Sequence, residues 1–169
     1  MTARSDEVPR DLPEPTELPP PSGGSPDTDA HAGRTFELDV TIDQALVDAY
    51  ADLLEDHNPL HSDVAYAART RFERPIAHGG ILFGIVSRVL GMDLPGPGTV
   101  YLSQTLNFLS PVYIGERLRF RVTETNVLPK SGAVLRVEIT KGDGTAVADG
   151  EARVKLPGWC LKRSEKRQT

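Results

Sequence analysis

The sequence has a single cysteine, lacks any long apolar run and carries no excess of positive charge. Cys160 cannot form a disulfide within the chain, and we expect it to have no part in the function. No run of about eighteen apolar residues is present and the N-terminus is polar, so we expect neither a membrane span nor a secretory signal, and a cytoplasmic protein. The net charge of -5 argues against nucleic acid as the main partner.

A change in composition near residue 33 marks the expected start of the folded part. Residues 1–33 hold half of the 14 prolines and almost no large apolar residues, so they cannot bury enough surface to offset the entropy lost on ordering. We therefore expect an acidic, proline-rich disordered tail there, and a short basic tail at residues 159–169. Residues 34–158 between them are enough for one domain around one core.

The domain opens with a strand pattern that changes into a helical pattern. Apolar and polar residues alternate over residues 36–40, which suits a half-buried strand. Thr41 and Gln44 then have the spacing of a capping box. Apolar residues recur at helical intervals after Thr41, so a helix is expected over residues 42–55.

Two more helices are expected after it. Asn58–Pro59 should end the first helix, because a residue before proline avoids the helical region. Ser62 could cap a short helix that runs through Thr70. Residues 81–90 are apolar around nearly the whole circumference of a helix, with Arg88 as the one charge, so this helix should be buried on almost all sides and end at Gly91 or soon after.

The second half of the chain alternates apolar and polar residues with a period of two. Four strands are expected there, at residues 99–108, 118–127, 133–141 and 146–156. Glycine and proline turn signals separate them, so most connections should be short and the sheet largely antiparallel. Together with the strand at residues 36–40, this predicts an α+β fold in which the sheet curls around the apolar helix.

The stretch EDHNPLHSD, residues 55–63, crowds titratable side chains where the first helical pattern ends. The spacing of Asp56 and His61 would let a carboxylate leave the helix and an imidazole return from the following turn, so that both converge on one small molecule. A carboxylate and an imidazole together suit proton transfer to and from water. Asn58 could hold the turn or position a ligand. Aspartate followed by Asn-Pro is also ordinary turn chemistry, so a purely structural role stays open.

A metal site is the other interpretation of these histidines. His57 and His61 have the HxxxH spacing of metal ligands, and His78 could supply a third nitrogen. That spacing works when both residues share one helix face, and Pro59 lies between them. We therefore expect no metal. His57 is then a surface residue, and His31 lies in the N-terminal tail.

Gly79 and Gly80 precede the apolar helix and form the second candidate feature. The N–H groups at a helix start are unpaired and lie at the positive end of the helix dipole, and glycine lets a ligand oxygen approach them. They could form an oxyanion hole that polarises a thioester carbonyl and opens its β-carbon to attack by water. Alternatively, the two glycines only allow tight packing between the loop and the helix.

These residues occur in motifs that resemble a known family. The motifs are D-x-N-P-L-H at residues 56–61, R-P-I-A-H-G at residues 74–79, and LPGPGTVYLSQTLNFLSPVYIGE at residues 94–116. They resemble the MaoC-like, (R)-specific enoyl-CoA hydratases over about residues 36–157. The resemblance implies a hot-dog fold, an antiparallel sheet wrapped around a long central helix, for residues 34–158.

The resemblance also implies roles for particular residues. Asp56 and His61 match the catalytic dyad of the family, and Gly79 matches the glycine whose N–H binds the thioester oxygen. Ser87 falls where these hydratases often have a serine near the dyad, although it could equally be a small packing residue. The implied reaction is the reversible addition of water to a trans-2-enoyl-CoA, an acyl-CoA thioester, giving the (3R)-hydroxyacyl-CoA. It requires neither a metal nor a redox cofactor.

The sequence departs from the family pattern at two positions. His57 stands where an aromatic or aliphatic residue is usual, and Gly80 stands where a larger apolar residue is usual. The second change removes a side chain that could line an acyl tunnel. Family members commonly form homodimers with sheets joined edge to edge, and residues 100–107 are the candidates for a wall of the site or an interface.

Three other functions fit the same pattern. A (3R)-hydroxyacyl-ACP dehydratase would use the same chemistry on a thioester of acyl carrier protein. A hot-dog thioesterase would direct water at the carbonyl carbon and release free CoA. A hot-dog subunit could bind acyl-CoA without turnover, but a site without catalytic function has no physical reason to keep both Asp56 and His61.

Overall fold

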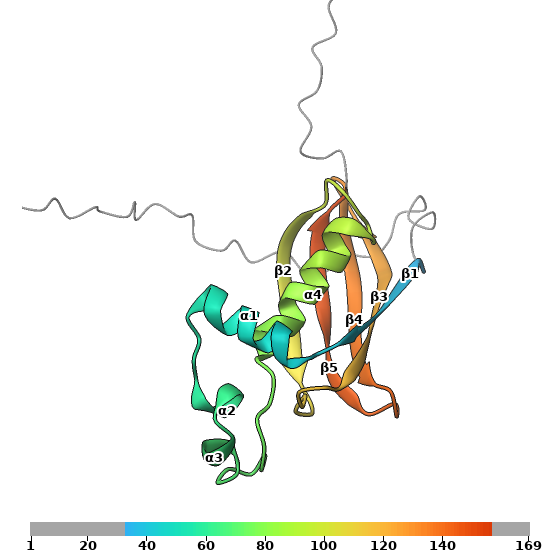
Figure 1. The fold of residues 1–169 in the computed structure, drawn as a ribbon. Coiled ribbons are helices and arrows are strands. Elements are labelled where there is room, and N and C mark those ends of the chain that lie inside the picture. The colour runs from blue at the N-terminus through green and yellow to red at the C-terminus, as the bar shows by residue number, and fades with distance from the viewer. Residues whose placement is uncertain (1–32, 157–169) are drawn as a thin grey trace, which may run out of the picture.

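The computed structural model describes residues 33–156, which form one antiparallel sheet and four helices (Figure 1). The strands are β1 (Thr35–Thr41), β2 (Val100–Phe108), β3 (Arg117–Leu128), β4 (Gly132–Lys141) and β5 (Ala146–Lys155). Their order in the sheet is β1-β3-β4-β5-β2, and all four pairings are antiparallel. All five expected strands are confirmed, with bounds that differ from the expected ones by a residue or less at each end. Apart from Gly33, the two expected tails lie outside the described residues, as do His31 and Cys160.

The sheet curves around α4 (Gly79–Met92), as Figure 1 shows. One face of this helix is buried, through Ile81, Leu82, Val86, Val89 and Leu90. The inner face of the sheet meets it with fully buried side chains. The largest apolar ones in the sheet are Leu118, Phe120, Val122, Leu135, Val137 and Ile139. The predicted α+β hot-dog arrangement, with a central helix inside an antiparallel sheet, is therefore confirmed.

The expectation that α4 is buried on almost all sides is wrong for the single chain. Gly84, Ser87 and Arg88 are exposed, and Met92 is 63% exposed. The curved sheet covers only one side of the helix, so the opposite side has no cover within residues 33–156.

The first helix, α1 (Gln44–Leu54), is capped differently from the prediction. Thr41 still belongs to β1, where it pairs with Arg117. Asp43 is the N-cap instead, and its carboxylate accepts a hydrogen bond from Leu46 N–H at 2.8 Å. The helix ends because Glu55 takes a left-handed conformation with φ of 55°, several residues before Pro59.

Two short helices follow in place of the one expected. Pro59 begins α2 (Pro59–Ser62) rather than ending α1, in agreement with the preference of proline for the first helical position. Asp63, not Ser62, is the N-cap of α3 (Val64–Ala67) and accepts from Tyr66 N–H at 2.9 Å. Of the described residues, no helix is long and apolar enough to cross a membrane.

Candidate active site

Asp56 lies in the connection between α1 and α2. Its N–H donates to Ala51 O at 3.0 Å, and its Oδ1 accepts a long hydrogen bond of 3.4 Å from Asn58 N–H. The left-handed Glu55 turns the chain out of the helix immediately before it. The Asp56 side chain is 48% exposed, so its carboxylate is open to solvent on one side.

His61 comes from α2 and is half-buried. Its Nδ1 lies 2.7 Å from the main-chain oxygen of Ile76. A carbonyl oxygen can only accept, so Nδ1 carries the proton and Nε2 keeps its lone pair in the neutral ring. This is the tautomer that leaves Nε2 able to accept a proton or to bind a water.

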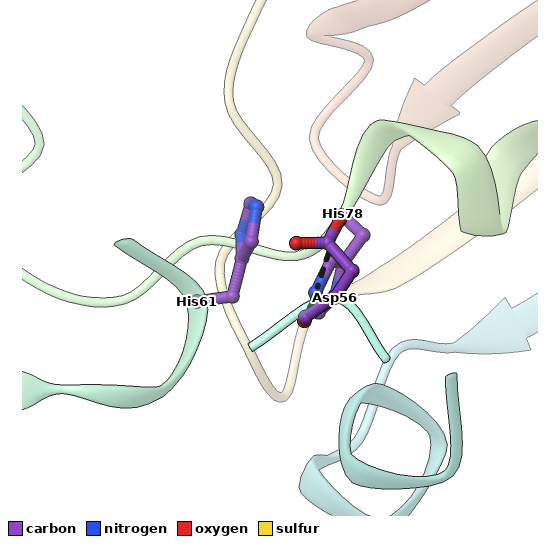
Figure 2. Close-up of side chains that lie close together, drawn as sticks. All are labelled: Asp56, His61 and His78. Atoms are coloured by element: carbon purple, nitrogen blue, oxygen red, sulfur yellow. Dashed lines mark hydrogen bonds and ion pairs between the residues drawn. The ribbon is translucent and has the colours of Figure 1, made fainter. Parts of the chain in front are cut away.

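The fold brings Asp56 and His61 together, and it adds His78 to them. One ligand atom from each of the three residues lies within 4.8 Å of the others. Figure 2 shows the Asp56 carboxylate extending toward the His61 ring, with His78 beside both. The rings of His61 and His78 have centroids 3.8 Å apart, and His78 Nε2 lies 3.0 Å from Asp56 O.

His78 is the site residue that sequence reasoning did not single out for this role. It was considered only as a third nitrogen for a metal held by His57 and His61. His57 is exposed and outside the group of three, so that ligand set is wrong. Within the described residues, the three side chains whose donor atoms could converge on an ion are Asp56, His61 and His78. The one available signal was the position of His78 directly before the glycine pair.

Asn58 holds the turn. Its Oδ1 accepts from Leu60 N–H at 3.0 Å, which makes it the N-cap of α2. Of the two roles considered for Asn58, the structural one is confirmed. The cap fixes the direction in which α2 leaves Asp56 and therefore the place of His61.

Gly79 and Gly80 form the first turn of α4, next to His78. His78 is the N-cap residue but makes no side-chain capping bond, and the Gly79 and Gly80 N–H groups have no acceptor among residues 33–156. Two free donors at the positive end of a helix are suited to binding a carbonyl oxygen that gains negative charge.

Neighbouring side chains also crowd both glycines. A Cβ on Gly79 would lie 2.9 Å from Cζ of Phe108, and a Cβ on Gly80 would collide with the Tyr50 hydroxyl. Tyr50 therefore occupies the space of the larger side chain expected at position 80. Phe108 belongs to β2 and Tyr50 to α1, so the crowding at these glycines is with other elements and not between the loop and the helix. It does not exclude the binding role.

Ser87 does not join the dyad in the single chain. It is exposed on the uncovered side of α4, and no hydrogen bond connects it to Asp56 or His61. Residues 100–107 lie in β2, which is an edge strand of the sheet. Tyr101 and Leu106 pack on the core, whereas Leu102 is 51% exposed.

A hollow beside a cluster of charged residues lies away from the dyad. It measures about 420 Å³ and is lined by side chains that include Asp39, Arg117, Arg119 and Lys141. Asp39 bonds Arg119 there at 2.9 Å, and this guanidinium holds the pKa of the Asp39 carboxyl below its usual value. The Asp56 side chain is 48% exposed and His61 is half-buried, so the dyad is open to solvent on one side.

Comparisons with known proteins agree with the fold. A family model described as a MaoC like domain matches residues 27–147. The chain is 44% identical over 126 residues to an (R)-specific enoyl-CoA hydratase of Aeromonas caviae, covering 74% of this chain and 94% of the relative. It is 43% identical to a 3-hydroxybutyryl-CoA dehydratase of Methylorubrum extorquens, covering 76% of this chain and 82% of the relative.

This chain is also similar to an enzyme named for acyl-carrier-protein thioesters and to a solved structure. The chain is 35% identical to a mitochondrial 3-hydroxyacyl-[acyl-carrier-protein] dehydratase of Solanum lycopersicum, covering 76% of this chain and 75% of the relative. The solved structure of an (R)-hydratase of A. caviae involved in PHA biosynthesis superimposes with a TM-score of 0.73 at 42% identity, covering 76% of this chain and 98% of that chain.

Proposed function

The chain belongs to the MaoC-like domain family, and we propose that it is an (R)-specific enoyl-CoA hydratase. It adds water reversibly to a trans-2-enoyl-CoA and gives the (3R)-3-hydroxyacyl-CoA. The observation that carries this proposal is the convergence of Asp56 and His61 beside a helix start with two free N–H groups.

The dyad holds and activates the water. His61 Nε2 and the Asp56 carboxylate are both free to accept its protons. As the water oxygen bonds to the β-carbon, the electrons of the double bond move toward the thioester oxygen. The Gly79 N–H stabilises that oxygen as its negative charge grows. The water proton held by the dyad is then returned to the α-carbon on the same side, which completes the addition of water.

Coenzyme A is the preferred carrier. The two relatives named for CoA thioesters are 44% and 43% identical to this chain, whereas the relative named for carrier-protein thioesters is 35% identical. Turnover of crotonyl-CoA and crotonyl-ACP at equal concentration measures this preference. Faster turnover of the carrier-protein substrate would make the chain a (3R)-hydroxyacyl-ACP dehydratase, and release of free CoA would make it a thioesterase.

The test of the dyad uses Asp56→Asn and His61→Gln, with His57→Gln as the matched control. His57 is an exposed histidine next to Asp56 and lies outside the group of three. Hydration is followed as loss of the enoyl absorbance of crotonyl-CoA. Each dyad variant should lose at least about a hundredfold in kcat with its circular dichroism unchanged, because a positioned acid or base contributes about that much. Near-normal turnover in both variants would refute the assignment.

In this proposal, a second copy of the chain covers the side of the dyad that is open to solvent. The edge strand β2 exposes Leu102, 51%, and Phe108, 55%, and Ser87 is exposed on the uncovered side of α4. A long edge strand with apolar side chains is a template for pairing. We therefore propose a homodimer interface at residues 100–107, with β2 of the two copies edge to edge. We also propose that the enzyme acts in the cytoplasm.

The oligomeric state tests the interface. Leu102→Glu places a charge on the exposed edge strand and should convert the dimer to a monomer in sedimentation or light scattering, with a loss of hydratase activity. Leu53→Glu is the matched control, because Leu53 is 77% exposed on α1 and outside β2. A wild-type monomer that is fully active would contradict the interface.

A further inference from the structure

His78 is a buried polar residue that the hydration steps above do not use. Its relative exposure is 3%, and among the described residues only His78 and Glu124 are both polar and buried. Burying an imidazole costs free energy unless its polar atoms are hydrogen-bonded. The contacts of His78 therefore indicate which role accounts for the burial of its imidazole.

The ring of His78 contacts both members of the dyad. Its Nε2 lies 3.0 Å from the main-chain oxygen of Asp56 and 3.9 Å from Oδ2 of the same residue. Because the carbonyl oxygen is an acceptor, Nε2 carries the proton and donates it. The ring also packs against the His61 ring, with the centroids 3.8 Å apart and the planes tilted by 33°, and its centroid lies 5.1 Å from that of the Tyr50 ring.

Residues 76–78 therefore hold both His61 and Asp56. Ile76 O accepts from His61 Nδ1 at 2.7 Å, and Ile76 N–H donates to Leu60 O at 3.3 Å. Ala77 N–H between them donates to Val112 O at 2.8 Å, which ties the stretch to the segment before β3. The side chain of His61 and the main chain of Asp56 are therefore both held by residues 76–78.

The second nitrogen of His78 defines its protonation state. Nδ1 is buried and has no hydrogen-bond partner among the described residues. With the proton on Nε2, a neutral ring leaves only a lone pair at Nδ1. A protonated ring would instead bury an N–H without an acceptor, and it would place a positive charge beside the His61 ring.

We propose that His78, as the neutral Nε2–H tautomer, is a positioning residue for the hydration. Its Nε2–H fixes the main chain of Asp56, and its ring fixes the plane of the His61 imidazole, so that both face one water. This inference rests on the proposed function. It assigns no proton transfer to His78.

Two variants separate the two contacts. His78→Phe keeps an aromatic ring against His61 and removes the donor, whereas His78→Gln keeps an N–H near the position of Nε2 and removes the ring. His78→Phe should lower kcat by about ten- to a hundredfold, because small displacements of catalytic groups cost that much. KM should change by less than about threefold, because the residue does not touch substrate. His78→Gln should recover part of the lost kcat, and His57→Gln should leave kcat unchanged.

Nitrogen NMR on the wild-type protein tests the same inference independently of turnover. With uniformly labelled protein at neutral pH, the imidazole ¹⁵N shifts of His78 should show a protonated Nε2 and an unprotonated Nδ1, and the His78 signals are assigned by their loss in His78→Gln. A doubly protonated ring or the Nδ1–H tautomer would overturn the proposal.

The outcomes distinguish the two proposals. If wild-type protein does not hydrate crotonyl-CoA, the proposed function fails, whatever the His78 shifts are. If the wild type is active and a folded His78→Phe variant keeps its full kcat, the positioning role fails and the hydratase assignment stands. If His78→Phe does not fold, the wild-type NMR measurement and the His78→Gln kinetics decide.

Discussion

Gly80 and Tyr50 occupy one shared volume, and this predicts an energetic coupling between them. A Cβ on Gly80 would overlap the Tyr50 hydroxyl and would lie 2.9 Å from Tyr50 Cζ. Inserting a methyl group into a filled site costs about 1–3 kcal/mol. Alanine recovers up to about 1 kcal/mol over glycine in a helix. Gly80→Ala should therefore lower the free energy of unfolding by about 1–2 kcal/mol.

Removing the hydroxyl should relieve most of that loss. In a Tyr50→Phe background, the atom that overlaps most is gone, and a small tilt of the ring accommodates the rest. The double-mutant cycle should then give a favourable coupling energy of about 1–2 kcal/mol between the two substitutions, well above the value for independent sites.

The assay is chemical and thermal unfolding of the four proteins at one fixed protein concentration, because the stability of an oligomer depends on concentration. The loss in Gly80→Ala corresponds to a fall in Tm of roughly 3–8 °C. Gly91→Ala is the matched control: it changes another glycine of α4, where nothing lies within 4 Å of the added Cβ. Equal effects of Gly80→Ala in both backgrounds, within about 0.5 kcal/mol, would refute the reasoning.

Two further predictions concern ionisable groups other than Asp56, His61 and His78. Arg34 donates to the buried Glu124 carboxylate at 2.7 and 2.8 Å. Arg34→Ala should therefore lower the free energy of unfolding by about 3 kcal/mol, because it leaves a buried charge unpaired. Adding Glu124→Gln should recover part of that loss. Burial raises the pKa of Tyr101 to about 12, so the folded state favours the neutral phenol more than the unfolded state does. The resulting contribution of Tyr101 to the free energy of unfolding is fully present below about pH 10 and is lost as the pH rises toward 12. In Tyr101→Phe, the free energy of unfolding should fall less between about pH 10 and 12 than in the wild type. An unchanged pH dependence of unfolding would contradict this prediction.

The site shows where prediction from the sequence ended. Asp56 and His61 were found because they are close in the chain and their chemistry is explicit in the residue types. His78 lies 22 residues from Asp56, and the contact between them exists only because the stretch before α4 folds back onto the α1–α2 connection. The same holds for Tyr50 and Gly80, whose shared volume no local pattern encodes.

The helix caps were missed for a related reason. Thr41 and Ser62 are good capping residues by type, but Thr41 is held in β1 by its pairing with Arg117, and the aspartates at 43 and 63 take the extended conformation that a cap needs. Pairing with a distant strand excluded Thr41 as a cap, and Ser62 is instead the last residue of α2.

The amino-acid sequence by itself determined the elements of this protein: the five strands, the apolar helix and the carboxylate and imidazole at the first helix end. These depend on periodicity and on residue types within a few positions of each other, which act through local backbone and burial preferences. Only the tertiary structure decided which side of α4 stays uncovered and which imidazole supports the dyad. Those features depend on contacts between residues far apart in the chain, and such contacts exist only once the sheet has closed around the helix.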